Sequence, residues 1–188
     1  MSVIYRELQD RRRYTFGAVK ETAQGFGNAL VERWQWKKGD MLCIFSPNDI
    51  DYGVAVYGVL WAGGTIAPAN PGYSVKDLAW LLKDASARAI VTQKPLLKVA
   101  QDAAREAGLQ PGSIILMGED EEGGPDVHHF KALSAKYAGR TQRPYRLSSD
   151  EDLAFLAYSS GTTVGLGING ATQVETASDA RNRAYRRE

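Results

Sequence analysis

The sequence predicts an α/β protein in which a parallel sheet is flanked by helices. Short apolar segments of strand length recur along the chain, and amphipathic segments of helical period separate them. Turn residues such as "KKGD" (37–40) and "AGG" (62–64) end these segments. Because ligands of open α/β sheets bind beyond the carboxyl ends of the strands, polar residues that follow a strand are the first candidates for a site.

The elements are expected in strict alternation. The first helix is capped by Thr15, and its apolar residues recur every three or four positions as far as Trp34. Ser74 is expected to cap a later helix, and Gly108 to close another. The predicted strands are 41–46, 65–70, 88–93, 113–118 and 152–159, and the predicted helices are 16–34, 50–61, 75–85, 95–107 and 129–137.

The composition indicates one globular unit. Of the 188 residues, 44% are hydrophobic and 24% charged, and the net charge of +1 does not indicate nucleic acid as a partner. No apolar run approaches the ~20 residues that span a bilayer. The charged start of the chain does not resemble a signal peptide, so a cytoplasmic protein is expected. The single cysteine, Cys43, lies in the apolar run "MLCIF" and is expected to be a buried, inert thiol.

Two polar stretches could be considered as metal sites, but a solvent-exposed loop and a surface or capping role explain them better. The acidic segment "EDEEGGPD" (119–126) lacks convergent ligand spacing and is expected to be a solvated loop. His128 and His129 are adjacent, so in most conformations their side chains point apart. A surface or capping role is therefore expected for both, and no metal site is predicted.

The segment "LAFLAYSSGTTVGLGING" (153–170) runs from a predicted strand into a glycine-rich loop. It does not fit a Walker-type phosphate loop, because Gly161 and Gly165 are too close and no lysine follows. Gly165, Gly167 and Gly170 match a dinucleotide-binding pattern, but they lie too far beyond the strand. We interpret that match as chance.

A third interpretation uses Ser159, Ser160, Gly161, Thr162 and Thr163. Four hydroxyl groups and several backbone N–H groups around one glycine form a donor-rich loop that suits phosphate oxygens. A polar loop whose hydroxyl groups bond to its own backbone is the alternative. From composition alone the two interpretations are nearly equally probable, and the position of the loop after a strand favours phosphate binding.

The segment "FLAYSSGTT" (155–163) resembles the phosphate loop of the adenylate-forming (AMP-binding) enzymes, which include acyl-CoA synthetases, 4-coumarate–CoA ligases, luciferases and peptide-synthetase adenylation domains. Upstream, "SPN", "GVLWAGGTIAPANP" and "YSVKDL" follow in the order and spacing of that family. The stretch "PANPGYS" looks most like the fungal and plant 4-coumarate–CoA ligase-like branch. The resemblance covers about residues 4–163 and implies the incomplete N-terminal subdomain of the adenylate-forming fold.

The resemblance implies a two-step acid–thiol ligase reaction. ATP activates a small-molecule carboxylic acid as an acyl-adenylate, and coenzyme A then accepts the acyl group. ATP, Mg²⁺ and CoA are therefore the cofactors that the family implies, in phenylpropanoid or fatty acid metabolism. Carried over to this sequence, residues Ser159–Thr163 correspond to the loop that holds the β- and γ-phosphates of ATP.

The sequence departs from the family pattern after Thr163. The family continues G-x-P-K-G, whereas this chain continues "VGLGINGATQVETASDARNRAYRRE" (164–188). We expect a partial AMP-binding domain over 1–163 and an aberrant, disordered tail over 164–188, without a peroxisomal signal. Such a truncated chain is expected to bind ATP weakly and to be inactive alone. The alternative is a non-catalytic interaction or regulatory fragment, which self-associates through apolar side chains such as Val54, Trp61 and Leu81.

Overall fold

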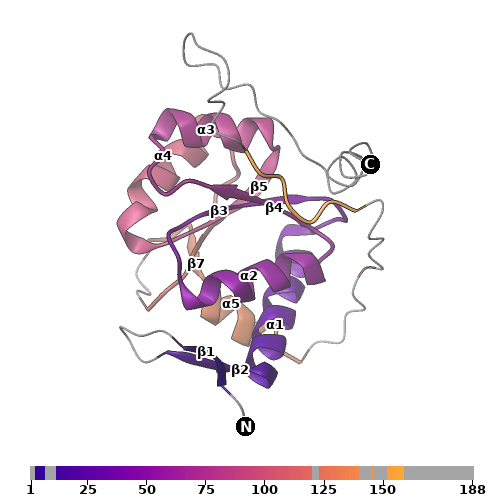
Figure 1. The fold of residues 1–188 in the computed structure, drawn as a ribbon. Helices are drawn as coiled ribbons and strands as arrows, with labels where there is room; N and C mark the ends of the chain where they lie inside the picture. The colour runs from indigo at the N-terminus through magenta and orange to yellow at the C-terminus, as the bar shows by residue number, and fades with distance from the viewer. Residues whose placement is uncertain (1–2, 7–11, 120–122, 140–144, 146–151, 159–188) are drawn as a thin grey trace, which may run out of the picture.

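A computed structural model gives the protein's fold, and it describes residues 3–6, 12–119, 123–139, 145 and 152–158. Five parallel strands form one sheet in the order β4-β3-β5-β6-β7 (Figure 1). Every neighbouring pair in this sheet is parallel, which confirms the predicted fold class. The strands are β3 (Met41–Phe45), β4 (Thr65–Ala69), β5 (Ala87–Thr92), β6 (Ile114–Leu116) and β7 (Val127–His129).

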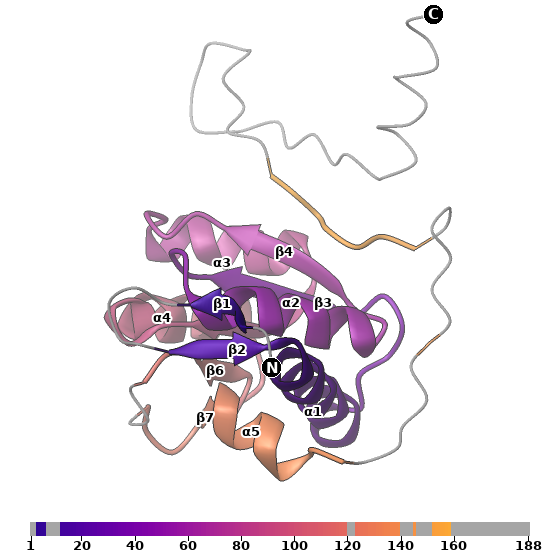
Figure 2. The same cartoon turned by 60° about the horizontal axis from the view of Figure 1, so that its bottom comes forward.

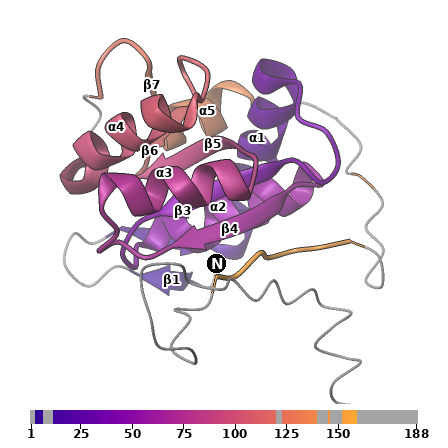
Figure 3. The same ribbon diagram turned by 90° about the horizontal axis from the view of Figure 1, so that it is seen from above.

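Helices cover both faces of this sheet (Figures 2 and 3). Three helices pack with one apolar cluster on one face: α1 (Phe16–Trp34), α2 (Ile50–Trp61) and α5 (Phe130–Lys136). Two helices pack with a second cluster on the other face: α3 (Val75–Asp84) and α4 (Leu97–Ala107), the latter preceded by a 3₁₀ turn, η1 (Lys94–Leu96). The connections between parallel strands therefore place helices on both sides, as in other doubly wound α/β sheets.

The central strand β3 is apolar along its whole length because both of its faces are covered. Leu42 and Ile44 point into the cluster formed with α1, α2 and α5. Cys43 and Phe45 point into the cluster formed with α3 and α4. Alternate side chains of a strand face opposite sides, so a strand buried on both sides loses the alternation of polar and apolar residues. The burial of Cys43 raises the pKa of its thiol well above the usual range, which confirms the predicted inert cysteine.

Three predicted helix ends, at Thr15, Ser74 and Gly108, are confirmed, and each depends on residues close together in the sequence, whereas α4 begins at Leu97, two residues later than predicted. The hydroxyl of Thr15 accepts a hydrogen bond from the backbone N–H of Ala18 at 3.2 Å. Ser74 and Asp77 form a reciprocal capping box at the start of α3. Gly108 closes α4 with a φ of 77°, a left-handed conformation that glycine adopts without steric strain.

Three short strands were not predicted. The strands β1 (Val3–Arg6) and β2 (Arg13–Thr15) form an antiparallel pair, and β7 adds to the end of the main sheet. β1 has four residues, and β2 and β7 have three each, so none is long enough to show an apolar period.

The predicted strand 152–159 needs a correction within its described part, residues 152–158. A single parallel bridge, between Ile66 of β4 and Phe155, joins this segment to the sheet. The N–H of Ile66 donates to the carbonyl of Ala154 at 3.0 Å, and the N–H of Leu156 donates to the carbonyl of Ile66 at 2.8 Å. The segment therefore lies beside β4 and extends the sheet order by one position, without forming a continuous ladder.

The expectation that Val54, Trp61 and Leu81 are partly exposed is wrong for two of the three. Val54 is fully buried and Leu81 is 1% exposed, while Trp61 is half-buried. Val54 packs in the cluster between α1 and α2, and Leu81 packs in the cluster between α3 and α4. The exposed large apolar side chains include Trp80 and Phe155, at 48% and 42%.

Candidate functional site

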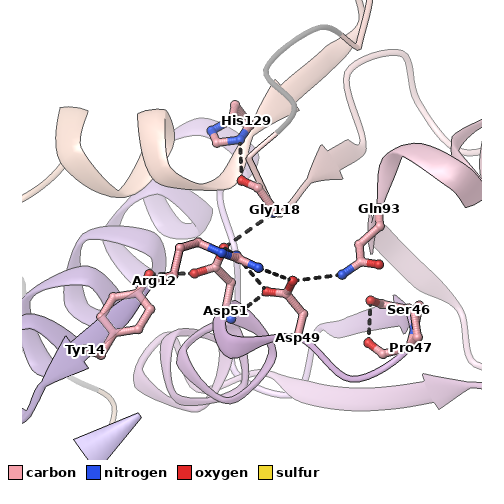
Figure 4. A network of polar contacts seen from close by, with 9 residues as sticks. All are labelled: Arg12, Tyr14, Ser46, Pro47, Asp49, Asp51, Gln93, Gly118 and His129. Carbon is pink, nitrogen blue, oxygen red and sulfur yellow. Dashed lines mark hydrogen bonds and ion pairs between the residues drawn. The ribbon is translucent and has the colours of Figure 1, made fainter. Parts of the chain in front are cut away.

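The carboxyl ends of the strands are the edge where a ligand is expected. β3 connects through α2 to β4 on one side, whereas β5 lies on the other side of β3. The strand order therefore reverses between the ends of β3 and β5, which is the usual binding position in doubly wound sheets. Asp49 follows β3 and Gln93 follows β5, so polar side chains flank this switch point (Figure 4).

An ion-pair network lies at this switch point. The amide of Gln93 donates from Nε2 to Asp49 Oδ2 at 2.9 Å, which joins the ends of the two strands. Arg12 donates from Nη2 to Asp49 Oδ2 at 2.8 Å and from Nη1 to Asp51 Oδ2 at 3.0 Å. The Arg12 guanidinium therefore partly neutralises two carboxylates, because its two terminal nitrogens bond to different aspartates.

Asp51 is the innermost member of the network. Its side chain has no exposed surface, and it accepts a hydrogen bond from the Tyr14 hydroxyl at 2.7 Å and one from the Gly118 N–H at 3.4 Å. Burial, and then the hydrogen bond to the Asp51 carboxylate, raise the pKa of Tyr14 far above its usual range. Tyr14 therefore stays a donor at every physiological pH.

The network is a structural junction more than a ligand site. It joins β2 to the start of α2, to the end of β5 and to the turn after β6, and its carboxylates are bonded by donors of the same chain (Figure 4). The described residues contain no group of three or more His, Cys, Asp or Glu side chains that could hold a metal ion. A ligand set for Mg²⁺ is therefore not found in this part of the chain.

Sequence reasoning missed the roles of Arg12 and Asp51. Asp49 caps α2 by accepting from the Asp51 N–H at 2.7 Å. The signal in the sequence is the "NDID" stretch, where two carboxylates follow a strand at one helix start. Their counter-ion could not be found in the same way, because Arg12 lies 39 positions before Asp51.

The adjacent histidines contact different partners, which fits the expectation that they point apart, but both are half-buried and the His129 side chain does not cap α5. Nε2 of His128 accepts from Nη2 of Arg33 at 2.8 Å, and the Trp34 ring meets the imidazole edge-on at 5.6 Å. Nε2 of His129 donates to the Gly118 carbonyl at 3.1 Å. The described residues of the acidic segment, Glu119 and 123–126, are mostly exposed, as expected for a solvated loop.

The predicted phosphate-loop residues Ser159, Ser160, Gly161, Thr162 and Thr163 lie outside the described residues, which end at Tyr158. The approach to that loop is well defined. The Thr65 hydroxyl donates to the Leu153 carbonyl at 2.7 Å, and Lys38 forms an ion pair with Asp152 at 2.8 Å. Because the segment is parallel to β4, it runs toward the carboxyl ends of the strands, and Ser159 follows Tyr158 directly.

The sequence model of the AMP-binding enzymes matches residues 2–164, which is most of the chain. The chain belongs to this family. It is 28% identical over 169 residues to a long-chain-fatty-acid–CoA ligase of Salmonella typhimurium, an alignment that covers 79% of this chain and 30% of the relative. It is 29% identical over 127 residues to 4-coumarate–CoA ligase 1 of Petroselinum crispum, covering 68% of this chain and 22% of the relative.

Solved structures of the family share the fold. An anthranilate CoA ligase in complex with anthranoyl-AMP superposes with a TM-score of 0.72 at 21% identity, over 83% of this chain and 29% of that ligase. The chain spans about 30% of the length of the long-chain-fatty-acid–CoA ligase that it matches. No helix among the described residues is both long and apolar enough to cross a membrane.

Proposed function

We propose that this chain is the N-terminal portion of an ATP-dependent acid–CoA ligase and supplies its first α/β unit and phosphate loop. In the complete reaction, a carboxylate oxygen attacks the α-phosphorus of ATP, pyrophosphate leaves, and an acyl-adenylate forms. The thiol of CoA then attacks the acyl carbon, loses its proton and displaces AMP. The observation that supports the proposal is the segment 152–158, which docks parallel to β4 and runs toward the carboxyl side of the sheet, directly before Ser159 in the sequence.

The proposed phosphate contacts are the hydroxyl and backbone N–H groups of Ser159, Ser160, Gly161, Thr162 and Thr163. These neutral donors fit the β- and γ-phosphates of ATP, because phosphate oxygens accept several hydrogen bonds in a confined space. Family membership implies Mg²⁺ and CoA, and the described residues give neither a defined place. For the chain alone we expect an ATP affinity no tighter than about millimolar, since neutral hydrogen bonds contribute about 0.5–1.5 kcal/mol each and millimolar binding corresponds to about 4 kcal/mol.

The proposed substrate class is a carboxylic acid, with fatty acids favoured over cinnamic acids. The long-chain-fatty-acid–CoA ligase named above aligns over 79% of the chain, and the 4-coumarate–CoA ligase over 68%. The resemblance of "PANPGYS" to the 4-coumarate branch supports the aromatic alternative.

An assay of pyrophosphate release tests the catalytic part of the proposal. The purified 188-residue chain is incubated with ATP, Mg²⁺, CoA and a panel of fatty and cinnamic acids, beside the Salmonella ligase as a positive control. We expect no acid-dependent release from the chain alone, because it spans about 30% of that ligase. Release that depends on the acid would contradict the proposed inactivity.

A titration of the isotope-labelled chain with ATP tests the loop. We expect amide shifts at 159–163 in the wild type, and weaker shifts when Ser160 and Thr162 are both changed to alanine. Thr22→Ala, in α1, is the matched hydroxyl control and should leave the titration unchanged. Shifts elsewhere in the chain, with none at 159–163, would contradict the assignment.

A non-catalytic interaction fragment is the second candidate, and exposed apolar side chains favour it. Phe155 is 42% exposed on the outermost segment beside β4, and Trp80 is 48% exposed on α3. We infer that copies of this chain associate through such side chains. Sedimentation at several concentrations should show reversible association that Phe155→Lys weakens. A wild-type chain that remains monomeric throughout would contradict this candidate.

A further inference from the structure

We propose that Tyr158 is a positioning residue that, through Asp84, attaches the start of the phosphate loop to α3. The Tyr158 hydroxyl donates to Asp84 Oδ2 at 2.9 Å, across 74 positions of sequence. The Trp80 ring, also from α3, meets the Tyr158 ring edge-on at a centroid distance of 5.8 Å and an angle of 76°. This role rests on the proposed phosphate binding by Ser159–Thr163.

The Tyr158–Asp84 hydrogen bond attaches the chain where segment 152–158 has few backbone hydrogen bonds to β4. The backbone bonds of segment 152–158 to β4 all involve Ile66, and they reach only as far as Leu156. The side chain of Tyr158 then continues the attachment, with its ring packed at the edge of the apolar cluster under α3 and its hydroxyl on Asp84. In the sequence, Ser159 directly follows Tyr158.

The helix that receives this contact is firmly placed. α3 begins with the Ser74–Asp77 capping box and buries Leu78, Leu81 and Leu82 against the sheet. A hydrogen bond from a phenol to a carboxylate is charge-assisted and therefore stronger than one between neutral groups. Burial, and then the Asp84 carboxylate, raise the pKa of Tyr158 above its usual range, so the hydroxyl keeps its proton.

The attachment of Tyr158 to α3 restricts the conformations of the following loop before ATP binds. A loop whose preceding residue is held in place has fewer conformations to lose when its donors converge on phosphate oxygens. Tyr158→Phe keeps the ring contact with Trp80 and removes only the hydroxyl. Asp84→Asn keeps an acceptor but removes the charge, and because Asp84 is exposed the variant can fold with a solvated amide.

The test compares wild type, Tyr158→Phe, Asp84→Asn and the double variant in the full 188-residue chain. Amide hydrogen exchange is measured at 159–161 without ligand, and ATP affinity is measured by titration. We expect exchange about tenfold faster and ATP binding severalfold weaker in Tyr158→Phe, smaller changes in the same direction in Asp84→Asn, and a double variant no worse than Tyr158→Phe. Tyr57→Phe, an exposed tyrosine on α2 across the sheet, is the matched control and should change neither readout.

The outcomes separate this proposal from the proposed function. Equal exchange at 159–161 in wild type and Tyr158→Phe would overturn the attachment. Faster exchange with unchanged ATP affinity would overturn the positioning role and leave only a structural contact. If the wild-type chain shows no ATP-dependent shift at 159–163, the phosphate-binding function itself fails, whatever the exchange rates are.

Discussion

At the scale of single residues, Arg12 is the cation on which a buried carboxylate depends. Its side chain is 12% exposed and contacts Asp51, which has no exposed surface. Arg12→Ala leaves Asp51 with the neutral donors of Tyr14 and Gly118. We expect the free energy of unfolding to fall by about 3–5 kcal/mol, the usual cost of removing one partner of a buried ion pair. Urea denaturation measures this loss.

Arg105→Ala is the matched control for Arg12→Ala. Arg105 also pairs with an aspartate, Asp102, but its side chain is 77% exposed. Exposed pairs contribute little because water and salt screen them, so the control should denature at the wild-type urea concentration. Equal losses in the two variants would show that the Arg12 network does not stabilise the fold.

The same residues show where sequence reasoning reaches its limit. The caps at Thr15 and Ser74 were predicted because each acts on a backbone group three positions away. Arg12 and Asp51 come into contact only when the folded chain brings β2 beside the start of α2, and no local sequence pattern indicates that contact. Ser159–Thr163 remain a prediction that rests on family resemblance and on the segment 152–158 before them.

At the scale of elements, His128 joins β7 to the C-terminal end of α1 and makes this contact sensitive to acid. Its Nε2 accepts from Arg33, while Asp126 and Lys136 are the other charged groups that act on it. Burial, and then the charge of Arg33, lower the pKa of His128 in the folded protein. The folded state therefore favours the neutral imidazole, and protonation removes the acceptor that Arg33 uses.

The sign of the pH effect follows from this lowered pKa. An unfolded histidine takes up its proton near pH 6.5, before the folded one does, so stability is complete above about pH 6.5 and decreases as the pH falls below it. Thermal unfolding of wild type and His128→Gln between pH 8 and pH 5 measures the effect. The glutamine keeps an acceptor for Arg33 and cannot titrate, so the variant should lose less stability in acid. A pH profile that His128→Gln leaves unchanged would contradict the assignment.

The long elements were predictable and the short ones were not. Strands β3, β4 and β5 have five or six residues and are buried on both faces, so their apolar runs are plain in the sequence. β7 reads "VHH" and becomes a strand because it pairs with β6 in parallel register. The secondary structure of such a segment depends on pairing with a neighbouring strand and not on the intrinsic preference of its residues.

At the scale of the whole molecule, residues 1–163 and 164–188 are proposed to behave differently. The family match ends at residue 164, and the tail beyond it lies outside the described residues. We expect a chain that ends at Thr163 to unfold at the wild-type temperature, because the described apolar clusters use residues only up to Tyr158. Differential scanning calorimetry of the two chains measures this, and a lower melting temperature for the shorter chain would show that the tail packs on the core.

The position of β3 has a consequence for the order of events during synthesis. β3 bonds to β4 on one side and to β5 on the other, and it leaves the ribosome before both of them. The first parallel pair can close around α2 while one edge of β3 still has unpaired backbone groups. That open edge persists until α3 and β5 have been translated, so the nascent chain is most exposed to mispairing, and most in need of a chaperone, during this interval.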